Sequence, residues 1–344
     1  MPEDPFKEFK PIMPIDEMLE TTYSKANKRA DSITDKHDKI REVKKKEIKR
    51  IQVAYKYVMD YFKEIVKSVP DLDQLPPFYF DLAQILVDND LLKQKLGRIS
   101  GVIKVLEHLM KEHVRSIPRM TKENDIRERR KQAFGRMKSV IDKLRGDFDY
   151  LMAARAKLRS LPVIDPGIPA VVIAGYPNVG KSSLVNNLCG SKIRVASYPF
   201  TTKEITIGLY DKGFDRIQFV DTPGILDRPM TERNQIERQA IAAMKHLANV
   251  IAFLMDPTPD CGYPVDVQLE LLREVSNYFP TIDRVIVLAK KDLIAQRELD
   301  EIIARLQRRG ETAIVPYSAV SRENEGKLLA VIKEKARPFL RRVT

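Results

Sequence analysis

Large apolar residues recur at alternating spacings of three and four up to about Leu161, and glycine is scarce in this part of the chain. Such spacing places one apolar stripe along a helix, so it predicts long amphipathic helices. Three stripes of this kind can bury one another as an antiparallel bundle. Their residues are Ile48, Ile51, Tyr55, Val58, Met59, Phe62 and Ile65; Leu92, Leu96, Ile99, Ile103, Leu106 and Met110; and Phe134, Met137, Ile141, Leu144, Phe148 and Leu151. A shorter helix is expected from Phe78 to Val87, after Pro70, Pro76 and Pro77.

The pattern changes after the proline-rich stretch from Leu161 to Pro169, where short apolar runs alternate with helical ones. This alternation is typical of a mostly parallel, doubly wound sheet with crossover helices. We therefore predict an α + α/β protein, with an antiparallel helical bundle over residues 1–165 and an α/β domain over residues 166–344. The expected strands are Ala170–Ala174, Ile205–Tyr210, Ile217–Val220, Val250–Met255, Val285–Ala289 and Ala313–Pro316, with helices after Gly180, Thr231, Tyr263, Gln296 and Asn324.

A glycine-rich turn follows the first expected strand and has the P-loop pattern Gly-x-x-x-x-Gly-Lys-Ser from Gly175 to Ser182. Successive backbone N–H groups in such a turn, together with the positive end of the next helix, can hold a polyphosphate. Lys181 should reach the β- and γ-phosphates, and the Ser182 hydroxyl should bind Mg²⁺. The predicted phosphate-binding residues are Gly175, Asn178, Val179, Gly180, Lys181, Ser182 and Ser183.

Two further segments are expected to complete this site. Asp221 ends an apolar strand at the sheet edge where doubly wound folds bind ligands, so its carboxylate should hold Mg²⁺ through water. Gly224 has no side chain and can bring its N–H close to the γ-phosphate. Between Tyr198 and Thr202, a threonine hydroxyl should complete the magnesium shell when the γ-phosphate orders the loop. Thr202 is our choice, with Thr201 as the alternative.

Base recognition is expected at Lys290 and Asp292, after a predicted strand, and again at Ser318 and Ala319. A carboxylate at Asp292 can accept both the N1–H and the exocyclic amine of guanine, a pair that adenine does not offer. Ala289 stands where the usual Asn-Lys-x-Asp box has asparagine. The lost neutral hydrogen bond is worth roughly 0.5–1.5 kcal/mol, against roughly 1.5–3 kcal/mol for each bond to a charged group. Selectivity for GTP and GDP should therefore survive.

Hydrolysis is expected to be slow, because Ile225 follows Asp-Thr-Pro-Gly where Ras-like enzymes carry a water-orienting glutamine. The predicted catalytic residues are Lys181, Thr202, Gly224 and Asn178. Asn178 resembles the asparagine of potassium-activated GTPases, where it binds K⁺ beside the phosphates; alternatively it only stabilises the turn. Arg228, close to the nucleotide loop, either assists hydrolysis or serves the structure of its loop, and the second role is favoured.

The formal charge of +12 and the pI near 9.4 favour a polyanionic partner, and most of the excess lies before Asp165. The candidate RNA-binding residues are Lys44, Lys45, Lys46, Lys49 and Arg50, with Arg127, Arg129, Arg130 and Lys131. Either run can equally be a solvated helix face. Cys189 and Cys261 show no disulfide or zinc spacing, which fits a reducing intracellular compartment. Without a signal peptide or a stretch of ~18 apolar residues, we expect a soluble protein with no membrane partner.

Several longer motifs are more specific than the P-loop. They are Gly175-Tyr-Pro-Asn-Val-Gly-Lys-Ser-Ser183, Tyr198-Pro-Phe-Thr-Thr-Lys203, Asp221-Thr-Pro-Gly-Ile-Leu-Asp-Arg-Pro229, Glu232-Arg-Asn-Gln-Ile-Glu237, Gln239-Ala-Ile241 and Cys261-Gly-Tyr263. Through these motifs the chain resembles the Nog family of nucleolar-type GTP-binding proteins, relatives of the Obg GTPases. The resemblance is clear from about Ile168 to Gln268.

The resemblance implies a GTPase that joins precursors of the large ribosomal subunit and contacts ribosomal RNA through its helical domain, with protein assembly factors as further partners. Eukaryotic members continue beyond the GTPase domain, whereas this chain ends at Thr344, so it resembles a short archaeal-type member. The expected location is cytoplasmic for an archaeal protein and nucleolar for a eukaryotic one. The alternatives are an Obg-like regulator of translation or stress acting on mature ribosomes or protein partners, and a helical adaptor that rarely hydrolyses GTP.

Overall fold

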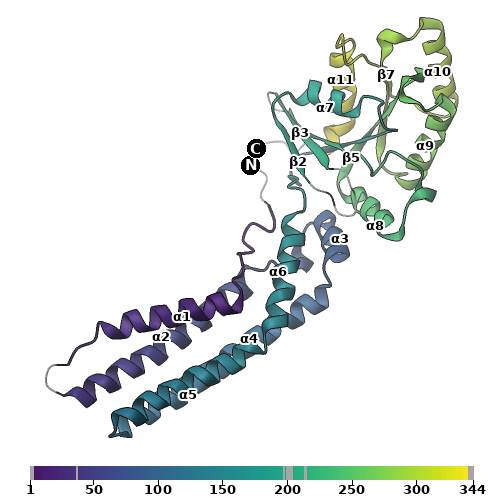
Figure 1. Ribbon diagram of the computed structural model, residues 1–344. Helices are drawn as coiled ribbons and strands as arrows, with labels where there is room; N and C mark the ends of the chain where they lie inside the picture. The colour runs from purple at the N-terminus through teal and green to yellow at the C-terminus, as the bar shows by residue number, and fades with distance from the viewer. Residues whose placement is uncertain (1–3, 36–37, 197, 199–203, 213–214, 340–344) are drawn as a thin grey trace. The chain divides into compact units, whose positions relative to one another are not determined.

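The computed structural model describes residues 4–35, 38–196, 198, 204–212 and 215–339 (Figure 1). The chain forms two compact units, which we describe separately. One unit contains Pro5–Leu72 and Leu86–Arg159. The other contains Asp73–Ile85 and the chain from Ser160 onward, so a short segment of the N-terminal half belongs to it.

The first unit consists of long helices packed along one another. They are α1 (Ile15–Asp31), α2 (Lys39–Ser68), α4 (Asn89–Ser116), α5 (Glu123–Asp142) and α6 (Arg145–Arg159). Most residues of the predicted apolar stripes are buried in its core, and the rings of Phe62 and Phe148 lie 5.6 Å apart between centroids. Five stripe residues are only half-buried: Ile48, Leu96, Ile103, Met110 and Phe134. Asp38 and Asp88 cap α2 and α4, because each carboxylate accepts a hydrogen bond from a free backbone N–H of the first turn.

Two features of this unit differ from the expectation. The third stripe was predicted to lie on one helix, but the helix is interrupted at Lys143 and Leu144, where tight backbone bonds join Leu144 to Ile141 and Asp147 to Leu144. Leu144 stays buried, so the apolar stripe continues across the interruption. Helix α1 was missed because half of its buried face consists of Thr22, Ala26 and Ala30 rather than large apolar residues.

The second unit is built on a seven-stranded sheet in the order β2-β3-β4-β1-β5-β6-β7. All neighbouring strands are parallel except β2 with β3 and β3 with β4. The strands are β1 (Ala170–Ala174), β2 (Ile193–Ala196), β3 (Ile205–Lys212), β4 (Asp215–Asp221), β5 (Ala248–Met255), β6 (Asp283–Leu288) and β7 (Ile314–Pro316). The predicted fold class, a helical part followed by a mostly parallel sheet, is confirmed. Strand β2 was missed because it is short and lies, half-exposed, at the edge of the sheet.

Helices cover this sheet as its crossover pattern requires. They are α7 (Lys181–Cys189), α8 (Gln235–Ala243), α9 (Val265–Tyr278), α10 (Gln296–Arg308) and α11 (Glu325–Ala336). Helix α7 packs on β3 and β4, while α9 and α11 pack on β5. Helix α3 (Pro77–Leu86) is the short helix expected near Phe78. No described helix carries an apolar stretch long enough to cross a membrane.

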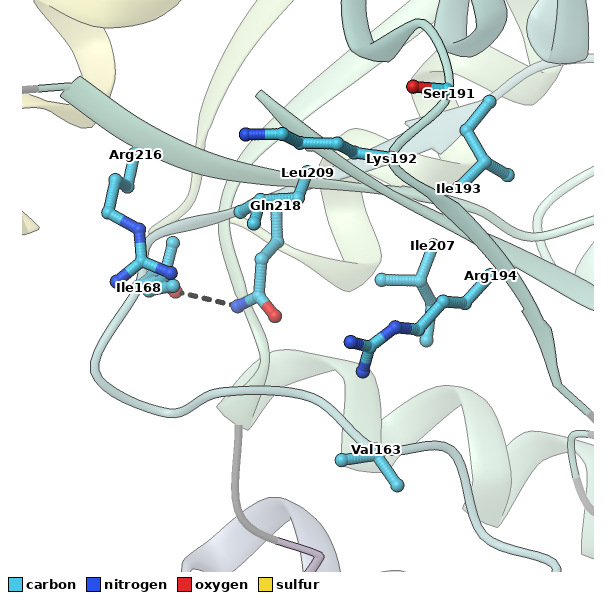
Figure 2. Close-up of a pocket in the computed structure, with 10 residues that line it drawn as sticks. All are labelled: Val163, Ile168, Ser191, Lys192, Ile193, Arg194, Ile207, Leu209, Arg216 and Gln218. Carbon is cyan, nitrogen blue, oxygen red and sulfur yellow. Dashed lines mark hydrogen bonds between the residues drawn. The ribbon is translucent and has the colours of Figure 1, made fainter. Parts of the chain in front are cut away.

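The proline-rich stretch after Ser160 is tied to the second unit by two buried polar side chains. The Tyr79 hydroxyl on α3 donates to the carbonyls of Pro162 and Ile164, at 2.9 and 3.1 Å. Gln218 on β4 donates to the carbonyls of Asp165 and Ile168, at 2.8 and 3.0 Å, and accepts the Asp165 N–H at 2.9 Å. Figure 2 shows the bond from Gln218 to Ile168 beside a cavity of about 340 Å³.

The bonds of Gln218 predict a clear cost when its amide is removed. Gln218→Leu keeps the approximate size of the side chain but leaves the Asp165 N–H and two carbonyls without their partner. We expect the free energy of unfolding to fall by about 1–3 kcal/mol, measured by urea denaturation. Gln296→Leu is the control, because Gln296 is exposed and its amide donates only to Asp300 on the same helix. Equal losses in the two variants would contradict this role for Gln218.

Candidate functional site

The candidate site lies at the carboxyl ends of the parallel strands, where doubly wound sheets bind ligands. Strand β1 lies between β4 and β5, so the turn after β1 is next to the turn after β4. The loops after β6 and β7 follow along the same edge. Segments far apart in the sequence are thus brought together by the strand order.

The turn after β1 has the backbone conformation of a phosphate-binding loop. Gly175, Asn178 and Gly180 have positive φ angles of 132°, 64° and 99°. At Gly175 a Cβ atom would lie 2.3 Å from the Leu254 carbonyl oxygen, so only glycine fits there. Asparagine tolerates the left-handed region better than most residues, which accounts for Asn178 in the turn without any cation. The structure therefore supplies a reason for the turn-stabilising alternative and leaves the potassium hypothesis as a prediction.

Lys181 begins α7 and turns its side chain back over this loop. Its ammonium group donates to the carbonyls of Gly175 and Tyr176, at 2.8 and 2.7 Å, and the side chain is buried. The charge is thereby held at the centre of the turn. The ring of Tyr176 stacks on Tyr263, with 4.1 Å between centroids, so the Cys-Gly-Tyr motif packs against the loop after β1.

Ser182 and Asp221 lie side by side, and the serine hydroxyl donates to the Asp221 carboxylate at 2.6 Å. Asp221 is fully buried, and burial raises the pKa of its carboxyl group, although the Ser182 bond and the Lys181 charge oppose the rise. Its Oδ1 atom has no hydrogen-bond partner among the described residues. Two hard oxygen ligands with one orphaned oxygen fit Mg²⁺, which is usually bound by one or two carboxylates together with phosphates.

The segment after β4 contains two residues of the quoted motifs whose pairing the motif analysis did not predict, Asp227 and Arg233. The Gly224 N–H donates to the Asp227 carboxylate at 2.6 Å, and the Arg233 guanidinium donates to Asp227 at 3.1 Å and to the Gly224 carbonyl. Burial lowers the pKa of Arg233, with the Arg228 charge adding to the effect. Asp227 and Arg233 stand six residues apart in a turn, so no helix or strand spacing pointed to their pairing.

Ile225 and Arg228 follow Gly224 in the same segment. Ile225 is buried, and its side chain is hydrocarbon, so it cannot orient a water molecule. Arg228 pairs with Glu237 at 2.9 Å, and Glu237 also completes the capping box of α8 with Asn234. These contacts support the structural role that we favoured for Arg228.

The expected base-recognition segments form a second pair of joined loops. The Lys291 N–H donates to the Tyr317 carbonyl at 3.1 Å, and Asn187 on α7 donates to the Ala319 carbonyl at 2.8 Å. Asp292 is exposed in the short turn after Lys290, while Ser318 is buried and accepts the Ser321 N–H at 3.1 Å. The loops that carry Lys290, Asp292, Ser318 and Ala319 are therefore brought together as predicted from their positions after β6 and β7.

Lys290 has a structural partner that the sequence did not reveal. Its ammonium group lies 2.7 Å from the buried Asp256 carboxylate and 3.4 Å from Asp260. Asp256 follows β5 and also accepts the N–H and hydroxyl of Thr258, at 2.9 and 2.7 Å. Ala289 is buried just before Lys290. Its N–H donates to the Met255 carbonyl at the end of β5, at 2.8 Å.

A cavity of about 390 Å³ opens beside the turn after β1. It is lined by Pro177, Asn178, Gly180, Lys181, Ser182, Ser183, Pro223 and Asp227. Val179 is buried beneath the turn. Thr201 and Thr202 lie outside the described residues. Tyr198, which precedes them, is buried and donates its hydroxyl proton to the Ala240 carbonyl at 2.9 Å.

In the helical unit, most basic residues of the run from Arg41 to Arg50 are engaged in ion pairs. Lys45 lies 2.8 Å from Asp35, Lys46 lies 2.5 Å from Glu42, and Arg50 lies 2.6 Å from the buried Glu47. Arg127, Arg130 and Lys131 pair with Glu123, Glu47 and Glu128. These contacts favour the structural interpretation for much of both runs.

Lys49 of this run also belongs to a set of lysines that lines a groove on this unit. Lys49, Lys56 and Lys63 are exposed at seven-residue spacing on α2, so they follow one face of the helix. They border a groove of about 500 Å³ whose other side includes Ile103 and Met110 of α4. Asp60 and Glu107 lie at the same groove, so the cationic excess there is small but continuous along the helix.

Comparisons with known proteins match both units. The family described as the NOG1 N-terminal helical domain matches residues 6–165, and the family described as 50S ribosome-binding GTPases matches residues 170–291. An uncharacterised protein of Methanocaldococcus jannaschii is 35% identical over 300 residues, covering 86% of this chain and 83% of that protein. Nucleolar GTP-binding protein 1 of Drosophila melanogaster is 30% identical over 339 residues, covering 97% of this chain and 52% of that protein.

One solved structure extends the comparison. The crystal structure described as nucleolar GTP-binding protein 1 of Plasmodium falciparum has 27% sequence identity and a TM-score of 0.45. It covers 52% of this chain and 91% of that chain. The chain spans about half the length of the nucleolar GTP-binding proteins that it matches.

Proposed function

Because the chain belongs to the Nog family of GTP-binding proteins, we propose that it is a GTP-hydrolysing switch in the assembly of the large ribosomal subunit, where it binds precursor ribosomal RNA. The family names of its relatives support the ribosomal setting. The nucleotide chemistry rests on the geometry of the site itself.

The observation that carries the nucleotide proposal is the pairing of Ser182 with the buried Asp221 directly beside the Lys181 loop. A buried carboxylate with one orphaned oxygen is costly unless a ligand completes it. Next to a turn that presents backbone N–H groups and a lysine, the ligand that fits is a magnesium-bound polyphosphate. Asp292 at the end of the same sheet edge supports guanine as the base.

We assign the residues to steps of hydrolysis as follows. The loop from Gly175 to Gly180 binds the phosphates through its N–H groups, and the Lys181 ammonium stabilises negative charge on the phosphoryl group as it is transferred to water. Mg²⁺, when bound by Ser182, Asp221 and Thr202, would neutralise charge on the β- and γ-phosphates. Gly224 would offer its N–H to the γ-phosphate once the Asp227 carboxylate is displaced from it. Ile225 orients no water, so intrinsic turnover should be slow.

For the RNA, we propose the groove lined by Lys49, Lys56 and Lys63 in the helical domain, residues 1–165. The run from Arg41 to Arg50 is less suited than the sequence suggested, because Lys45, Lys46 and Arg50 are already paired. Three lysines spaced about 10 Å apart along α2 can each contact a phosphate of an RNA strand, and each neutralised phosphate releases counterions. The GTPase domain would decide when the RNA is released.

We predict that the chain binds guanine rather than adenine nucleotides despite Ala289. Asp292→Asn should weaken the preference roughly tenfold or more, since hydrogen bonds to a charged acceptor are lost. Titration with fluorescent GDP and ADP measures both constants. Asp300→Asn is the control, because Asp300 is an exposed acidic residue of α10. This change should leave the preference unchanged. Comparable binding of GDP and ADP by the wild type would rule out the assignment of Asp292.

Slow hydrolysis accelerated by K⁺ is the next expected outcome, based on Asn178 and Ile225. Initial rates of phosphate release should be higher in KCl than in NaCl at equal ionic strength. Asn178→Gly offers a sharp control, because glycine accepts the φ of 64° without strain but has no side-chain carbonyl. Loss of the potassium effect in Asn178→Gly would support binding of K⁺ by this side chain. Equal rates in the two salts for the wild type would refute the potassium hypothesis.

The RNA proposal predicts a salt dependence that depends on the lysine groove. Affinity for structured large-subunit RNA should fall with log salt at a slope of about 0.7–0.9 per phosphate contact. Changing Lys49, Lys56 and Lys63 to glutamate should reduce that slope by about two to three without altering GDP binding. The matched control changes Arg273, Arg297 and Arg308, exposed cations of the other unit, to glutamate. If the control variant reduced the salt slope as much as the groove variant, RNA affinity would depend only on net charge.

A further inference from the structure

The cavity beside Lys181 contains an acidic side chain where the proposed ligand is itself an anion. Asp227 lines this cavity together with Lys181, Ser182 and Ser183. A fixed negative charge in a polyphosphate site opposes the binding of anions. It can also distinguish two ligands, if it repels one of them more strongly than the other. Asp227 is buried and held by specific bonds, so it is not a side chain that happens to reach the cavity from solvent.

The Asp227 carboxylate accepts a hydrogen bond from the same backbone N–H that the γ-phosphate of a triphosphate would need. The Gly224 N–H donates to Asp227 Oδ2 at 2.6 Å. Gly224 has a φ of 81°, and this backbone turn directs its N–H to the carboxylate three residues further on. An anionic oxygen therefore already occupies the bond that we assigned to the γ-phosphate.

Arg233 holds the carboxylate from its other side. The guanidinium donates to Asp227 Oδ1 at 3.1 Å and to the Gly224 carbonyl, which closes a ring of Gly224, Asp227 and Arg233. The Arg233 side chain is 1% exposed and that of Asp227 is 7% exposed, so water screens this pair little. The ring keeps Asp227 at the Gly224 N–H until a competing anion replaces it.

On the basis of the proposed GTPase function, we propose that Asp227 determines the preference of this site between nucleoside diphosphates and triphosphates. A diphosphate ends before Gly224 and leaves the Asp227 bond in place. A triphosphate must displace the carboxylate from the Gly224 N–H, and its affinity is lowered by the free energy of that displacement. Arg233 is the positioning residue, because it holds the carboxylate at the amide without contacting the nucleotide.

The test measures the ratio of dissociation constants for a non-hydrolysable GTP analogue and for GDP at saturating Mg²⁺, using fluorescent nucleotides and the full chain. Asp227→Asn keeps an acceptor for Gly224 but removes the charge. The ratio should fall about tenfold, the order expected when a charged hydrogen bond is replaced by a neutral one. Asp227→Ala removes both the acceptor and the charge, and it should shift the ratio in the same direction.

Two controls separate discrimination from loop structure. Asp227→Glu retains the charge and should keep the ratio within about twofold of wild type, on the same reasoning about charged acceptors. Asp266→Asn removes an exposed carboxylate that pairs with Arg305, and it should change neither constant. The proposal is overturned if both neutral variants keep the wild-type ratio, or if Asp227→Glu shifts it as far as Asp227→Asn.

Failure of the proposed function would look different. A wild-type chain that bound adenine nucleotides as well as guanine nucleotides would refute the GTPase assignment. The diphosphate-to-triphosphate ratio could still be measured, with ADP and a non-hydrolysable ATP analogue. Asp227 recognises the number of phosphates and not the base, so its role is judged by that ratio in either case.

Discussion

The close approach of Gly175 to strand β5 is the constraint on which the site depends. A Cβ atom at this position would lie 2.3 Å from the Leu254 carbonyl oxygen, so only glycine lets the turn after β1 run this close to β5. That passage sets the start of α7, and with it the positions of Lys181 and Ser182. Because β1 is central, the same passage brings Ser182 to Asp221 at the end of β4. One backbone contact thereby aligns the Ser182 hydroxyl at the start of α7 with the Asp221 carboxylate at the end of β4.

Buried carboxylates in the two units show the difference between a structural and a functional charge. In the helical unit, Asp147 pairs with Lys95 and Arg98, and Glu47 pairs with Arg50 and Arg130. Each of these charges is balanced by two cations, as stability requires of a buried ion. Asp221 instead accepts a hydrogen bond from the neutral Ser182 hydroxyl, and burial raises the pKa of its carboxyl group.

The second unit includes a helix from the N-terminal half of the chain. Helix α3 holds the proline-rich stretch through Tyr79, and its Asp81 lies 3.4 Å from His246, just after α8. Helix α8 in turn accepts the Tyr198 hydroxyl from the loop that contains Thr202 in the sequence. These bonds link α3 to the segment after α8, and α8 to Tyr198.

The sequence by itself determined the parts of this protein that depend on local spacing. The P-loop, the six expected strands and the three apolar stripes follow from patterns within short windows, because helix and strand periods repeat every few residues. Helix α1 was not predicted because small residues weaken its apolar pattern, and strand β2 was not predicted because it lies at an exposed edge of the sheet. The partners of buried charges, Asp227 with Arg233 and Lys290 with Asp256, were decided only by the tertiary structure. Oppositely charged residues can pair at any separation along the chain, so no sequence spacing predicts which two will meet. Their partners follow from the packing that buries them together away from water.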